Sequence, residues 1–158
     1  MRQPFTLVLA VAVTSLSRAA ELPGDAKTAL DKATQIEVYS LDPVFPEEDA
    51  KKAFHGWKVL GKTTIKDEKQ RKALVVALEK GVKEREDKAP ECFQPRHGLR
   101  VVRDGKTVDL VICFQCYTIQ VFVGKEDKRD VLIGRSPQPA LDKLLTDAGI
   151  KLAPKPEK

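Results

Sequence analysis

The chain has 158 residues, of which 42% are hydrophobic and 32% charged, a balance typical of one globular domain rather than two. Its formal net charge is +5, but basic and acidic residues are interspersed along the chain, as in the segment KEDKRD. Nucleic-acid grooves combine a basic stripe with aromatic side chains that stack on bases. The sequence contains no such run, so we expect no nucleic-acid partner.

The first twenty residues show the three parts of a secretory signal peptide. Arg2 supplies the basic start, an apolar run follows, and the small residues Ser17 and Ala19 stand at the −3 and −1 positions of a cleavage site. The apolar run is short for a membrane span. We therefore predict that residues 1–20 direct export to the periplasm or the extracellular space and are removed, leaving no stable membrane insertion. The alternative is an uncleaved N-terminal anchor.

Hydrophobic periodicity predicts eight elements in the mature chain. The pattern indicates strands over 34–41, 57–65, 98–104, 106–114, 117–123 and 131–134, and helices over 68–86 and 137–148. Asp67, followed three residues later by Gln70, forms a capping box that marks the start of the longer helix. Asp104 and Gly105 between two strand patterns are a strong hairpin signal.

This order of elements predicts an α+β fold, with an antiparallel β-sheet of about five to six strands and two main helices packed on one face. We place a single α+β domain over residues 34–152. A polar leader that can include a helical turn precedes it over residues 21–33, and a disordered tail follows over residues 153–158.

All three cysteines and one of the two histidines fall within residues 91–116, namely Cys92, His97, Cys113 and Cys116. The predicted hairpin brings the two ends of this segment side by side, at a cross-strand distance between Cβ atoms of about 5 Å. Cys113 and Cys116 can both join such a cluster only if CFQC turns or bulges, because alternate residues of a strand point to opposite faces.

The length of the hairpin turn decides what His97 faces. A two-residue turn at Asp104 and Gly105 places His97 opposite Ile112, whereas a three-residue loop places it opposite Cys113. Both registers remain open from the sequence.

Four interpretations of the cluster are open. Three cysteines and one histidine are a known tetrahedral zinc set, and the odd number of cysteines slightly favours a metal site, because one disulfide would leave a free thiol. Alternatively, Cys92 forms a disulfide with Cys113 or Cys116, or CFQC is a redox-active dithiol that lacks the helix N-terminus of such motifs. The thiols could also be buried core residues. A Cys113 and His97 nucleophile pair lacks a third orienting group, and we expect His55 to be a surface or packing residue.

The segment CFQPRHG, followed after the hairpin by VDLVICFQC, resembles a pattern in exported proteins of planctomycete-type bacteria. These proteins share a CF-x-PRHG segment, a short hairpin and an ICF-x-C segment. The resemblance covers roughly residues 34–150 and is strongest over residues 92–116. That family has no established activity, so the resemblance implies no substrate. It implies only the grouping of Cys92, Pro95, Arg96, His97, Gly98, Cys113 and Cys116.

From these observations we expect an exported module that binds a metal ion of the zinc type through Cys92, His97, Cys113 and Cys116. The first alternative is a disulfide-stapled structural or interaction domain without catalysis. The second is a thiol-redox protein. No motif in the sequence points to a substrate class or to an oligomeric state.

Overall fold

The computed structural model describes residues 21–155, except 47–48, 50, 86–89 and 125–126. The predicted signal peptide over residues 1–20 therefore lies outside the described residues, as do residues 156–158 of the predicted tail. Within the described part of the chain, no helix has the length and apolar character needed to cross a lipid bilayer.

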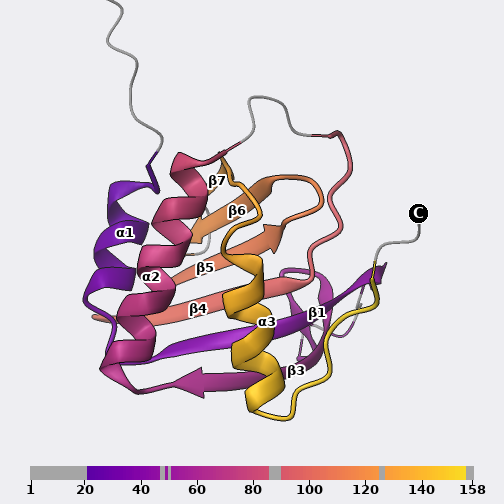
Figure 1. The fold of residues 1–158 in the computed structure, drawn as a ribbon, viewed down its shortest axis with the longest axis horizontal. Helices are drawn as coiled ribbons and strands as arrows, with labels where there is room; N and C mark the ends of the chain where they lie inside the picture. Colours follow the sequence, from indigo (N-terminus) through magenta and orange to yellow (C-terminus); the bar gives the residue numbers. More distant parts are fainter. Residues whose placement is uncertain (1–20, 47–48, 50, 86–89, 125–126, 156–158) are drawn as a thin grey trace, which may run out of the picture.

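One antiparallel sheet of seven strands forms the framework, in the order β2-β3-β1-β4-β5-β6-β7. Its strands are β1 (Ile36–Pro46), β2 (Ala53–Phe54), β3 (Trp57–Ile65), β4 (His97–Arg103), β5 (Lys106–Cys113), β6 (Thr118–Val123) and β7 (Asp127–Leu132). The helices are α1 (Gly24–Asp31), α2 (Glu68–Lys83) and α3 (Gln138–Asp147). All three helices lie on the same face of the sheet (Figure 1), and the sheet curls into a half-barrel.

The expected fold of five to six strands and two main helices is wrong, since the described residues form seven strands and three helices. The extra strand, β2, has only two residues, too few to show an alternating pattern. The extra helix, α1, occupies the segment that we expected to be a polar leader. Its buried Ala26, Ala29 and Leu30 recur at helical spacing among charged residues, which hides a narrow apolar stripe.

The main core lies between the sheet and the helices. Its fully buried side chains include Leu78 from α2, Leu99 from β4, Leu110 from β5 and Leu141 from α3. The buried side of α2 therefore faces the sheet. The first of the two hydrogen bonds of the predicted capping box is confirmed, because the Asp67 carboxylate accepts a hydrogen bond of 2.8 Å from the Gln70 backbone amide.

A two-residue turn joins β4 and β5 and decides the register left open by the sequence. Asp104 and Gly105 have φ values of 50° and 73°, as a type I′ turn requires. His97 therefore pairs with Ile112, the first of the two predicted registers.

The second face of the sheet is partly covered by the hairpin of β2 and β3. Phe54 at the tip of this hairpin stacks on Tyr39 of β1, with ring centroids 4.3 Å apart. It also lies directly over Gly98 of β4, where an added Cβ would be 2.7 Å from a Phe54 ring carbon. The glycine of the PRHG segment is therefore needed for the close approach of this aromatic ring.

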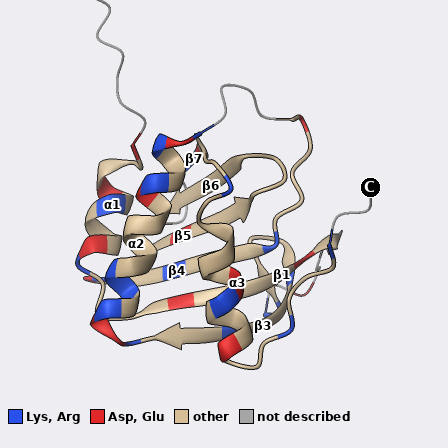
Figure 2. Cartoon of the chain, viewed as in Figure 1, with Lys and Arg blue, Asp and Glu red and all other residues tan. Residues whose placement is uncertain are grey.

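Basic and acidic residues are interspersed along the helices and strands (Figure 2). The helices carry ion pairs at helical spacing, for example between Lys143 and Asp147 of α3 at 2.8 Å. Such exposed pairs contribute little to stability, about 0.3–0.5 kcal/mol each. This distribution of basic and acidic residues agrees with a solvated surface.

Candidate functional site

The three cysteines meet at the end of the hairpin. Residues 114–117 turn between β5 and β6, with Tyr117 in the left-handed region at φ 53°, so CFQC turns as its clustering required. Cys113, the last residue of β5, and Cys116, within the turn, form a disulfide, with their Cα atoms 5.2 Å apart. The sulfur of Cys92 lies 3.0 Å from the sulfur of Cys116. We call these three residues the sulfur triad.

His97 does not join the sulfur triad. It lies on the helix face of β4, in line with the core residue Leu99, and its ring meets Phe114 edge to face at 5.4 Å. Its cross-strand partner is Ile112, so the next residue, Cys113, points to the opposite face of the sheet. In the described part of the chain, no group of three or more His, Cys, Asp or Glu side chains is placed to hold a metal ion.

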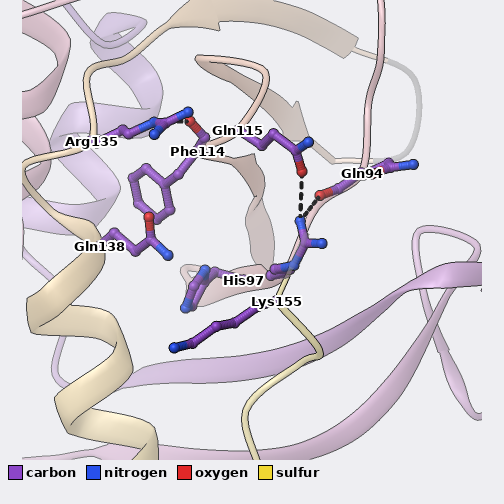
Figure 3. A pocket seen from close by; sticks show the side chains of 8 residues that line it. Gln94, His97, Phe114, Gln115, Arg135, Gln138 and Lys155 are labelled. Carbon is purple, nitrogen blue, oxygen red and sulfur yellow. Dashed lines mark hydrogen bonds between the residues drawn. The ribbon is translucent and has the colours of Figure 1, made fainter. Parts of the chain in front are cut away.

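A cavity of about 270 Å³ lies on the helix side of the CFQC turn. We call it the basic pocket. Its lining residues are Gln94, Arg96, His97, Phe114, Gln115, Arg135, Gln138 and Lys155. These come from four separate segments of the chain, and their side chains surround a common space (Figure 3). Three of the lining residues are cations and, among the described residues, no Asp or Glu lines the pocket.

Arg96 is the most constrained of these cations. Its backbone amide donates to the Ile112 carbonyl at 3.3 Å, and its own carbonyl accepts from the Leu41 amide at 3.0 Å. Its guanidinium donates to the Pro154 carbonyl at 2.7 Å, and also to a Gln94 carbonyl and the Gln115 side chain (Figure 3).

All of these acceptors of the Arg96 guanidinium are neutral oxygens, and burial lowers the pKa of Arg96 below its ordinary value. A guanidinium that has lost part of its hydration without gaining a carboxylate is a good partner for an incoming anion.

Arg135 ties the β7–α3 connection to the CFQC turn. Its Nε donates to the Phe114 carbonyl at 3.2 Å, and its guanidinium lies over the Tyr117 ring at 4.9 Å from the centroid. Gln138, the first residue of α3, stands beside it in the pocket wall. The N-terminal end of this helix adds a partial positive charge to the same wall.

His97 contributes a buried imidazole to the pocket wall. Its Nε2 donates to the Asp142 carboxylate of α3 at 2.8 Å, and the residue is only 3% exposed. Among the described residues, its Nδ1 has no hydrogen-bond partner, and neither has the hydroxyl of the fully buried Ser40. Ser40 and His97 are cross-strand partners, so two unsatisfied polar atoms lie at the same position of the sheet, next to the pocket.

A second polar cluster lies on the other face of the sheet. The buried Asp109 carboxylate accepts hydrogen bonds from Arg100 at 2.8 and 2.7 Å and contacts the His55 ring nitrogen Nε2 at 2.7 Å. The His55 ring also stacks on Phe122 of β6, with centroids 3.8 Å apart. This contact joins the hairpin of β2 and β3 to a strand near the opposite edge and holds the sheet in its curled shape.

Burial by itself raises the pKa of Asp109, but the hydrogen bonds from Arg100 and His55 outweigh this effect and hold the pKa below its usual range. The three polar contacts of the Asp109 carboxylate all come from within the chain. The cluster therefore stabilises the fold.

Sequence reasoning missed most of the residues around the basic pocket. Arg135, Gln138 and Lys155 are far from the PRH segment in sequence and carry no motif. For the second cluster a signal was present, because the register that pairs His97 with Ile112 also pairs Arg100 with Asp109. That opposite-charge pair could have been found by extending the register along the hairpin.

No protein-family model, curated protein or solved structure matches the chain. The geometry of the site therefore carries the functional argument alone.

Proposed function

We propose that this protein is an exported binding domain that holds a small anion, a phosphate or a carboxylate, in the basic pocket. The observation that carries the proposal is Arg96, a partly buried guanidinium that converges with Arg135 and Lys155 on one cavity. Its hydrogen-bond acceptors among the described residues are all neutral oxygens. Arginine matches the planar, two-oxygen geometry of phosphate and carboxylate groups.

The size of the pocket restricts the ligand. A cavity of about 270 Å³ lies just below the range of about 300–1,000 Å³ that is common for drug-sized ligands. Phe114 supplies an apolar surface in the lining, while three glutamine residues can each donate and accept hydrogen bonds. We infer a ligand with a single anionic head and a short body.

His97 also lines the pocket, where its Nε2 donates a hydrogen bond to the Asp142 carboxylate and its ring meets Phe114 edge to face. These two contacts fix the imidazole in the pocket wall.

Two-dimensional ¹⁵N–¹H NMR with sodium phosphate at constant ionic strength tests the proposal. We expect saturable shifts of the Phe114, Gln115 and Gln138 signals, and a loss of affinity of about tenfold or more in Arg96→Gln. The matched control is Arg103→Gln, the same change at the other end of β4, which should bind like the wild type. Shifts that do not saturate, or equal affinity in both variants, would contradict the proposal.

A further inference from the structure

The sulfur triad has a chemical feature that the basic pocket does not use. Cys113 and Cys116 form a disulfide, and the free sulfur of Cys92 lies 3.0 Å from Cys116. Cys92 is exposed, whereas Cys113 and Cys116 are fully buried. One accessible thiol is thus placed directly against a disulfide that solvent does not reach.

A thiolate in contact with a disulfide sulfur is the arrangement from which thiol–disulfide exchange begins. The rate of such exchange depends on access of the attacking sulfur, and here the fold brings that sulfur into contact. The segment that carries Cys92 is held by Phe93, which packs on the second face of the sheet and meets Trp57 edge to face at 6.2 Å. The packing of Phe93 therefore holds Cys92 where its sulfur contacts the sulfur of Cys116.

We propose that Cys92, Cys113 and Cys116 form a three-cysteine exchange site in which Cys116 is the shared sulfur and Cys92 connects the buried disulfide to external thiols. In the internal step the Cys92 thiolate attacks the Cys116 sulfur. A Cys92–Cys116 bond forms, the Cys113–Cys116 bond breaks, and Cys113 leaves as a thiolate that takes up the proton released by Cys92. No atom or electron is gained or lost.

The external step uses a thiol-bearing partner, which is the co-reactant. Its thiolate attacks the exposed Cys92 sulfur of the Cys92–Cys116 bond, so a mixed disulfide forms on Cys92 and Cys116 leaves as a thiolate. A second partner thiol then attacks the partner sulfur of the mixed disulfide and frees Cys92. The protein disulfide has been reduced to two thiols, and two partner thiols have been oxidised to one disulfide.

Disulfide exchange would also change the wall of the basic pocket. Phe114 and Gln115 lie inside the loop that the Cys113–Cys116 bond closes, and both line the basic pocket. Exchange to Cys92–Cys116 opens that short loop and links the turn to the segment before β4 instead. The exchange site itself does not depend on whether the pocket binds an anion.

Tryptic mapping after acid quenching and alkylation distinguishes the two disulfides. Cleavage yields one peptide of residues 89–96 with Cys92 and another of residues 107–125 with both other cysteines. The Cys113–Cys116 bond gives a looped peptide, whereas Cys92–Cys116 gives two linked peptides. We expect both products from the wild-type protein, with alkyl label divided between Cys92 and Cys113, and complete Cys92–Cys116 bonding in Cys113→Ser.

Reduction by glutathione, a small tripeptide thiol, gives the second readout. Removal of the accessible sulfur in Cys92→Ser should slow reduction of the remaining disulfide by about tenfold or more, because the buried sulfurs must then react directly. Pro90→Ala, an exposed change on the same segment that does not line the basic pocket, is the control and should be reduced at the wild-type rate. Label found only on Cys92, reduced thiols in oxidised Cys113→Ser, or equal rates for Cys92→Ser and the wild type would each overturn the proposal.

Discussion

Replacement of Asp109 by Asn tests the buried charge cluster that holds the sheet in its curled shape. The Asp109 carboxylate is 5% exposed and receives two hydrogen bonds from Arg100 and one contact from His55. An Asn side chain keeps the shape but has one acceptor oxygen and an NH₂ group, so at least one donor loses its acceptor.

The expected loss of unfolding free energy follows from the burial of Asp109 and Arg100. Breaking a buried ion pair by removing one charge typically costs about 3–5 kcal/mol. Arg100 is 36% exposed, so water can partly rehydrate its guanidinium, and we expect the lower end, about 3 kcal/mol. With a urea m value of about 2 kcal/mol per molar, the unfolding midpoint should fall by about 1.5 M.

Urea unfolding followed by far-ultraviolet circular dichroism measures this loss. The matched control is Asp104→Asn, the same change in an exposed turn where Asn also tolerates a positive φ of 50°, and it should alter stability by less than about 0.5 kcal/mol. Equal midpoints for the two variants would refute the argument that the cluster is a major stabilising contact.

The stabilising effect of Asp109 should be lost at low pH. The pKa of Asp109 is lower in the folded protein than in the unfolded chain, so its contribution to stability is present above the unfolded value of about 3.9. It is lost as the pH falls through the folded pKa. The stability difference between the wild type and Asp109→Asn should therefore be largest near neutral pH and become smaller below about pH 4.

Three further predictions concern the close packing, the cysteines and the N-terminus. Gly98→Ala should lower the free energy of unfolding by about 1–3 kcal/mol, since its Cβ would meet the Phe54 ring, and equal urea midpoints would contradict this. Zinc binding remains a prediction for the fully reduced protein. Competition with a chromogenic chelator should show loss of affinity in Cys116→Ser and no loss in His97→Gln, since His97 faces the helices, and unchanged affinity in Cys116→Ser would exclude a thiolate site. Intact mass of protein exported by a bacterial host should begin near residue 20, after cleavage at Ala19 or Ala20, and an uncleaved chain would instead support the anchor.

The local signals of the sequence predicted the central hairpin well. Asp104 and Gly105 specify a tight turn by themselves, because their backbone tolerates the positive φ values that the turn requires, and the turn then determines every cross-strand pair between β4 and β5. The long helix α2 was also predictable from local sequence, because its N-cap and its buried apolar residues lie within one continuous segment. The meeting of the three sulfurs followed from the same hairpin and from the turn at CFQC.

The sequence alone could not determine which distant segments would pack against the side chains on each face of the sheet. His97 and Cys113 are close in the hairpin, yet the alternation of strand residues sends one to the helices and the other to the second face. Asp142, Arg135 and Lys155 reach the site only because α3 and the C-terminal segment pack across the end of the sheet. Such contacts depend on which surfaces bury one another, a property of the whole chain, and no local pattern of residues encodes them.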